Sequence, residues 1–161
     1  LGSDTATINL VNVNDAPVIV NNTFSLLENS ANATLVGLVP VTDPDLGDTH
    51  TYSITAGNTS GAFSIDNTGA LVVLNVGALD FELIPVFTLT VRVQDAAGAF
   101  DTATIIVNLL NVNESAVGPV SDTNVATNQV NENSMIGTTV GLTANATDGD
   151  TLDLITYSLD D

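Results

Sequence analysis

The chain has 161 residues, with 19 Asp or Glu, a single Lys or Arg, and no Cys. A net charge of −18 repels phosphate backbones and anionic head groups, so we expect no nucleic-acid partner and no direct membrane insertion. The absence of Cys excludes disulfides, zinc–thiolate sites and thiol catalysis, whereas an apolar content of 44% is enough for a folded core.

Apolar residues alternate with Thr, Ser and Asn along much of the chain, which is typical of strands that bury one face. Turn sequences such as Asp43-Pro44-Asp45 and Asp66-Asn67-Thr68-Gly69 separate these runs. Seven short strands in roughly 100 residues predict an all-β fold, a Greek-key immunoglobulin-like sandwich. In chain order we expect the strands at residues 17–27, 34–42, 50–55, 62–66, 70–75, 86–94 and 101–111.

Short sequences recur about 100 residues apart, which predicts tandem repeats. Asn12-Val13-Asn14-Asp15 recurs as Asn111-Val112-Asn113-Glu114, and Glu28-Asn29-Ser30 recurs as Glu132-Asn133-Ser134. We therefore expect the last strand of a preceding repeat, one complete repeat, and a linker with the first strands of an incomplete following repeat, at residues 1–13, 14–114 and 115–161.

The incomplete repeat raises the question of what covers its apolar residues. Residues 120–161 supply three strands of a sandwich, whose edges and apolar side would be exposed alone. We expect this segment to be ordered only if a neighbouring chain completes it, and the strand at residues 4–11 is one candidate.

The acidic residues are predicted to gather at the two ends of the complete repeat, because strand direction alternates through a sandwich. One end receives Asp15, Asp43, Asp45 and Asp95, and the other receives Glu28, Asp80, Glu82 and Glu114. Crowded carboxylates favour a bound divalent cation, and calcium takes about 6–8 oxygen ligands. Softer metals find few ligands in a chain with no Cys and one His. Asp48, Asp66 and Asp101 are better explained as turn residues.

These motifs, taken in order, resemble those of the cadherin repeat family. Glu28-Asn29 resembles its first calcium-binding Glu motif, Leu79-Asp80-Phe81-Glu82 its Leu-Asp-x-Glu motif, and Asp43-Pro44-Asp45 its Asp-x-Asp motif. Asp95 resembles the Asp that ends the sixth strand, and residues 111–114 resemble the acidic linker between repeats. The family's linker usually opens with Asp, where this chain has Asn12 and Asn111, so we expect fewer or weaker ions at each joint.

The resemblance implies Ca²⁺ sites between consecutive repeats. The lower joint would use Glu28, Asp80, Glu82, Asn111, Asn113, Glu114, Asp148 and Asp150. The upper joint would use Asn14, Asp15, Asp43, Asp45 and Asp95, with Asn12 as a further candidate. An EF-hand is excluded, because the twelfth residue counted from Asp43 is Ile54 rather than Glu.

The predicted function is structural. His50 is the one His and is expected to be a surface strand residue, so we predict no catalytic residue and no enzyme. The chain resembles bacterial cadherin-like arrays, which implies a calcium-dependent rigid spacer in a large extracellular adhesin, secreted or at the cell surface, with neighbouring repeats as its partners. The alternative is a direct adhesive module that binds another repeat homophilically or a polysaccharide. It would need an exposed aromatic or apolar patch, of which the sequence gives little sign.

Overall fold

The computed structural model describes residues 5–150 and 153–159. The chain divides into two compact units, residues 1–111 and 112–161. No helix among the described residues has the length and apolar character needed to cross a membrane.

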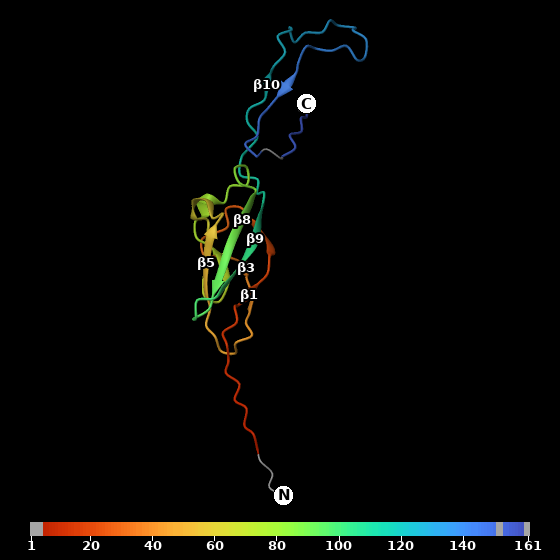
Figure 1. Cartoon of the computed structure of the whole chain (residues 1–161). Coiled ribbons are helices and arrows are strands. Elements are labelled where there is room, and N and C mark those ends of the chain that lie inside the picture. The colour runs from red at the N-terminus through yellow and green to blue at the C-terminus, as the bar shows by residue number, and fades with distance from the viewer. Residues whose placement is uncertain (1–4, 151–152, 160–161) are drawn as a thin grey trace. The chain divides into compact units, whose positions relative to one another are not determined.

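The first unit is an all-β sandwich (Figure 1). Its strands are β1 (Val18–Ile19), β2 (Asn22–Leu27), β3 (Leu35–Leu38), β4 (Val41–Thr42), β5 (Thr51–Ala56), β6 (Phe63–Ile65), β7 (Ala70–Val73), β8 (Val86–Gln94) and β9 (Phe100–Leu110). Two short 3-10 helices, η1 (Thr59–Gly61) and η2 (Val76–Ala78), lie in the connections. These elements confirm the predicted sandwich, with nine strands where the sequence predicts seven.

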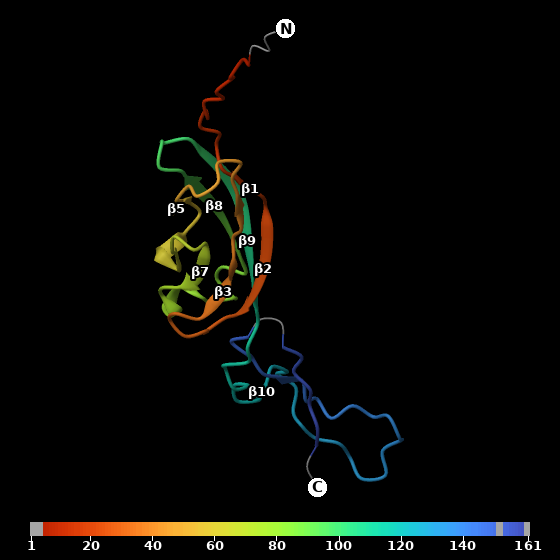
Figure 2. The same ribbon diagram turned by 90° about the horizontal axis from the view of Figure 1, so that it is seen from below.

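Two sheets face each other across the core. One has the order β2-β9-β8-β5 and the other has the order β3-β7-β6. The pair β2–β9 is parallel, whereas β8 pairs antiparallel with both β9 and β5. Figure 2 shows β2 lying along β9. This arrangement brings the end of β2 beside the end of β9. It thereby positions Glu28, which directly follows β2.

The first two predicted strands are each split in two. The first strand becomes β1, which pairs with β4, and β2, which pairs with β9. The second becomes β3, which pairs with β7, and β4. Pro40 lies between β3 and β4 and has no N–H to donate, so the ladder cannot run through it.

The core follows from the period-two alternation that the sequence shows. Phe87, Leu89, Val91 and Val93 of β8 are buried, and the residues between them lie on the outer face of the sheet. Across the core, Phe63 packs edge-on against Phe87, with ring centroids 5.1 Å apart. Burying one such large apolar side chain contributes about 1.5–3 kcal/mol.

The second unit repeats the local structure of the first. Its strands β10 (Ser121–Asp122) and β11 (Ala144–Asn145) form an antiparallel pair, as β1 and β4 do. Asn29 and Asn133 both adopt a positive φ, 55° and 62°, which Asn tolerates better than most residues. The Ser that follows each Asn, Ser30 or Ser134, donates its hydroxyl to the carbonyl three residues earlier, at 2.7 Å in both units.

Neither the strand predicted at residues 4–11 nor the last of the three strands predicted in residues 120–161 forms in the described residues. Residues 5–17 and 153–159 contain no strand, and residue 4 and residues 160–161 lie outside the described part of the chain. In the first unit the corresponding strands, β9 and β5, both take hydrogen bonds from β8. No strand corresponding to β8 pairs with either segment in the described residues, so their alternating sequence has no ladder to join.

Candidate metal centres

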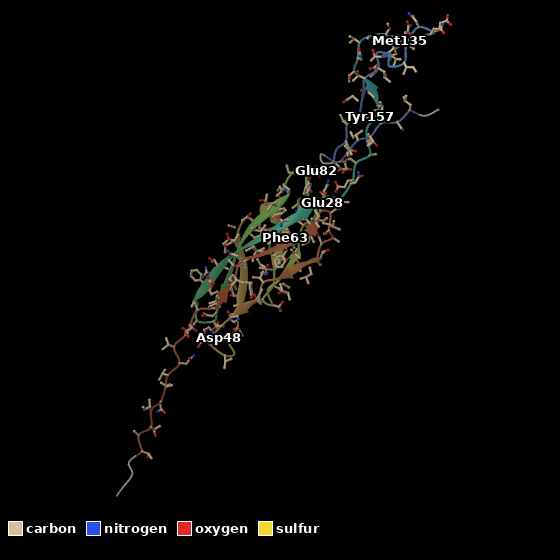
Figure 3. The ribbon with its side chains drawn as sticks, turned by 90° about the vertical axis from the view of Figure 1, so that its right-hand side faces the viewer. Glu28, Asp48, Phe63, Glu82, Met135 and Tyr157 are labelled. Carbon is tan, nitrogen blue, oxygen red and sulfur yellow. The ribbon has the colours of Figure 1, made fainter. Side chains whose placement is uncertain are left out.

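The N-terminal cluster lies at one end of the first unit and consists of Asn12, Asn14, Asp15, Asp43, Asp45, Asp48 and Asp95. Asp43, Asp45 and Asp48 follow β4, and Asp95 follows β8. Asp43, Asp48 and Asp95 each bring one carboxylate oxygen within 4.8 Å of the others. Asp45 and Asp95 are buried. Figure 3 shows Asp48 at this end of the sandwich.

The residues before β1 converge on these carboxylates. Asn12 Nδ2 and the Asp15 N–H both donate to the Asp45 carboxylate, each at 2.6 Å. Asn14 Nδ2 donates to Asp95 Oδ2 at 2.8 Å. The structure therefore brings together all the upper-joint residues that the sequence predicted.

Two carboxylates of the N-terminal cluster, Asp43 and Asp95, have a pKa lowered by hydrogen bonds. The hydrogen bond between His50 Nε2 and Asp43 Oδ2, 2.8 Å long, is the main cause that lowers the pKa of Asp43. The bond from Asn14 is the main cause that lowers the pKa of Asp95, and the Gly98 amide, at 2.6 Å, lowers it further. Negative charge at this end of the unit is therefore maintained at neutral pH.

The C-terminal cluster lies at the other end of the first unit and consists of Glu28, Asp80, Glu82 and Asn111. Glu28 is only 2% exposed, and its Oε2 accepts from the Phe81 N–H at 2.7 Å. This bond holds the Glu28 carboxylate against the Leu-Asp-x-Glu segment. Asp80 Oδ1 accepts from the Leu83 N–H at 2.8 Å and shapes the same turn. Glu28 and Glu82 bring carboxylate oxygens within 4.8 Å of each other, and Figure 3 shows them side by side.

Two oxygens of the C-terminal cluster test whether calcium fits. Glu82 Oε1 and Asn111 Oδ1 are buried and accept no hydrogen bond within the described part of the chain. Buried polar atoms are nearly always paired, so an unpaired oxygen calls for an ion or a water molecule. The donor set contains only carboxylate and amide oxygens, which are the ligands that calcium prefers. The residues therefore fit this ion.

The second unit rebuilds the arrangement of Asp15 and Asp45. Asp150 is 2% exposed and its Oδ2 accepts from the Glu114 N–H at 2.9 Å and the Ser115 N–H at 2.8 Å. Asp148 Oδ1 accepts from the Asp150 N–H at 3.1 Å. Asn113 donates its side-chain amide to the Asp153 carboxylate. That these residues share a calcium joint with the C-terminal cluster stays a prediction.

Comparison with known proteins identifies the family. The family model described as Cadherin domain matches residues 22–110. The chain is 33% identical over 165 residues to "Protocadherin-like wing polarity protein stan" of Drosophila melanogaster, covering 99% of this chain and 4% of that protein. It is 34% identical over 155 residues to "Cadherin-23" of Mus musculus, covering 94% of this chain and 5% of that protein. The chain belongs to the cadherin family.

Solved cadherin structures share the fold. The protocadherin gammaB4 extracellular domain has a TM-score of 0.68 and 26% identity, covering 86% of this chain and 22% of that one. Mouse cadherin-23 EC22-24 has a TM-score of 0.62 and 27% identity, covering 83% of this chain and 43% of that one. The cadherin resemblance in the sequence is thereby confirmed for family and fold. The bacterial origin that the sequence suggested stays a prediction.

Two residues were assigned differently by sequence reasoning. The sequence predicts a turn role for Asp48, and its N–H does donate to Asp45 O at 3.3 Å, but one of its carboxylate oxygens also lies within 4.8 Å of oxygens of Asp43 and Asp95. His50 was expected only as a surface strand residue, yet its ring reaches Asp43 immediately before β5. The sequence signal for both residues was that Asp48 and His50 follow Asp43 closely along the chain, within the same loop. By contrast, Asp66 accepts from its own turn, and Asp101 accepts from the Ile19 N–H, so both are structural.

Proposed function

We propose that this chain is a calcium-binding segment of a larger extracellular adhesion protein, in which ions at the ends of cadherin repeats stiffen the array into a rod. The observation that carries this proposal is the pair of buried oxygens on Glu82 and Asn111 that accept no hydrogen bond from the residues the structure describes. They lie on residues that the cadherin resemblance marks as ligands. The chain spans only about a twentieth of the curated relatives' length, 4% and 5% for the two described above, so the adhesive role belongs to the whole protein.

The mechanism begins with carboxylate repulsion. Like charges held within about 5 Å repel one another strongly when partly shielded from water. A bound calcium ion supplies positive charge that links the oxygens and removes this repulsion. In the N-terminal cluster Asp43, Asp45 and Asp95 would hold the ion, while the linker residues Asn12, Asn14 and Asp15 fasten the preceding segment to the same loops. The linker thereby becomes part of the ion site rather than a free tether.

An extracellular setting suits sites of this kind. Weak calcium sites built from oxygen ligands have dissociation constants of roughly 10⁻⁴–10⁻³ M, which are typical of extracellular modules. The related solved chains are described as extracellular cadherin domains and ectodomains. Calcium that binds only the folded state adds stability by mass action. The array would therefore stiffen after export, where the weak sites fill.

Calcium titration of the 161-residue chain tests the proposal. We expect millimolar calcium to raise the melting temperature, because a ligand at about 1–10 times its dissociation constant stabilises the folded state by about 0.4–1.4 kcal/mol. Glu82→Gln should reduce this shift, whereas Asp66→Asn, which also removes one charge, should keep it. The proposal is wrong if calcium and excess chelator give the same melting temperature and the same small-angle scattering profile.

One observation favours a second role, homophilic contact. Phe100 is 53% exposed, and the Arg92 guanidinium lies 3.9 Å from its ring centroid, on the outer face of β8 and β9. Arg92 is the chain's only Lys or Arg, so this patch is the one place where a carboxylate of a second copy would find a cationic side chain of that type. A Phe100→Ala variant that associates as strongly as the parent chain in sedimentation would count against this role. Polysaccharide binding stays a prediction.

A further inference from the structure

The Arg92 and Phe100 side chains lie on a sheet face that carries no acid. Residues alternate in exposure along β2, β5, β8 and β9, and every outward position of these strands is uncharged apart from Arg92. Asp101 is the one acid within these strands, and it lies on the opposite side of the sheet, where it accepts from the Ile19 N–H. In a chain with 19 Asp or Glu, an anionic group therefore meets little repulsion at this face.

The Arg92 guanidinium has no polar partner within the fold. The salt bridge found among the described residues joins His50 and Asp43, and Arg92 forms none with a described carboxylate. Its Nε is buried and donates no hydrogen bond within the same part of the chain. Buried N–H groups are nearly always paired, so this cation calls for an acceptor from outside the chain. The Phe100 ring, whose centroid is 3.9 Å away, stacks on the guanidinium and orients it.

Hydroxyl groups flank Arg92 on both sides. Ser53 of β5 and Thr102 of β9 are its Cα partners, so the three side chains form a row across strands that are about 4.8 Å apart. Figure 1 shows β5, β8 and β9 side by side. The Thr51 hydroxyl donates to Gln94 O, whereas the Ser53 and Thr102 hydroxyls make no hydrogen bond within the described residues. These two hydroxyls are therefore available to a ligand.

Gln94 and Phe100 extend the row of polar groups with an acceptor and an apolar surface. They are Cα partners, and the Gln94 amide donates to Gly98 O at 3.0 Å, which leaves its Oε1 free to accept. Phe100 is 53% exposed, so part of its ring can pack against the C–H groups of a ligand. A cation, two hydroxyls, an amide oxygen and an aromatic ring thus lie together on one rigid sheet.

We propose that the Arg92 patch, defined as Ser53, Arg92, Gln94, Phe100 and Thr102, binds a sugar acid, which carries one carboxylate on a ring with hydroxyl groups. The guanidinium would hold the carboxylate through paired N–H donors, a geometry that suits Arg. The side chains of Ser53, Thr102 and Gln94 would bind the ring hydroxyls. Small-molecule sites commonly combine an apolar surface with a few placed polar groups of this kind.

The charge and polarity around the patch favour this ligand over two others. A net charge of −18 repels a polyanion, whereas a single carboxylate is balanced by Arg92. A carboxylate from a second copy would pair with the guanidinium but leave the hydroxyls of Ser53 and Thr102 unused. A single uronic acid unit of a glycan satisfies both. Binding of this ligand does not require the calcium sites, so it goes beyond the proposed function.

NMR titration of the 161-residue chain with glucuronate, glucose and acetate tests the proposal. We expect glucuronate to shift the amides of Ser53, Arg92 and Thr102 with a midpoint at least about tenfold lower than glucose or acetate, because each of those probes lacks half of the recognised groups. Arg92→Gln should raise the glucuronate midpoint about tenfold, because it removes the charge-assisted hydrogen bonds. Thr88→Ala, on the same face but outside the patch, should leave it unchanged.

A second variant keeps the test independent of any effect of Arg92→Gln on folding. Phe100→Leu retains Arg92 and an apolar side chain but removes the ring, so it should also weaken glucuronate binding. Equal midpoints for glucuronate and acetate, or no shift at the three amides, would overturn the proposal. Shifts of these amides with protein concentration alone would assign the patch to a second copy and overturn it as well. None of these results would alter the calcium titration that tests the proposed function.

Discussion

The two units carry the same local motifs but differ in their cores. Both have the Glu-Asn-Ser turn, the Asp-x-Asp loop and a short antiparallel strand pair. The first unit surrounds these with a continuous cluster of buried apolar residues. In the second unit Val120, Leu142, Ala144, Tyr157 and Leu159, with Thr156 and Ser158, line an open hollow of about 390 Å³.

The difference shows which features need only neighbouring residues. A hydrogen bond between a side chain and an amide two or three residues away can form wherever the short sequence occurs. A sheet needs partners that are distant along the chain, since β2 pairs with β9 and β5 with β8. We therefore expect substitutions in the core to change the stability of the first unit much more than that of the second. Substitutions in the local motifs should change the stability of both units by similar amounts.

The largest expected effect is on the core. Phe87→Ala should cost the first unit about 3–5 kcal/mol, because it leaves a cavity beside Phe63. Met135→Ala in the second unit should change stability by less than about 0.5 kcal/mol, because Met135 is 83% exposed. Urea unfolding of both variants measures this contrast. Similar losses would mean that the second unit also has a cooperative core.

A smaller effect is expected at the two matching tyrosines. Tyr52 donates its hydroxyl to Val39 O at 3.0 Å within the sandwich, so Tyr52→Phe should cost about 0.5–1.5 kcal/mol. The Tyr157 hydroxyl accepts from the Ala146 N–H at 2.9 Å, but Tyr157 is half exposed and water can replace it. Thermal melting should therefore shift for Tyr52→Phe and stay unchanged for Tyr157→Phe. An equal shift for both would remove the distinction between the units.

The smallest effect concerns acid pH. Hydrogen bonds lower the pKa of Asp66, chiefly the one from Thr68, and of Asp122, chiefly the one from the Thr143 amide. A lowered folded-state pKa means that each bond network stabilises the fold above the unfolded pKa of about 3.9 and is lost as pH falls through the folded pKa. NMR titration should find both carboxyls ionising below that value. An ordinary pKa at Asp122 alone would show that the second unit does not hold its β10–β11 pair.

The predictable part of the site follows from strand direction. Alternating directions placed Asp43, Asp45 and Asp95 at one end, and the structure finds them there with the linker asparagines. The same reasoning brought Glu28 to the Leu-Asp-x-Glu segment. Asp48 and His50 were not assigned to the cluster, because their side-chain directions depend on how one loop closes, and residue spacing does not specify loop closure.

The sequence by itself determined the strand pattern, the repeat, the sorting of acids to two ends and the cadherin resemblance. Each depends on local periodicity or on short motifs. Only the tertiary structure decided which oxygens lie within reach of one ion, and which buried oxygens, on Glu82 and Asn111, lack a hydrogen-bond partner among the described residues. It also decided that residues 5–17 and 153–159 form no strand, although their sequences alternate like β9 and β5. The physical reason is that a strand is stabilised by its neighbours, and these belong to distant parts of a repeat.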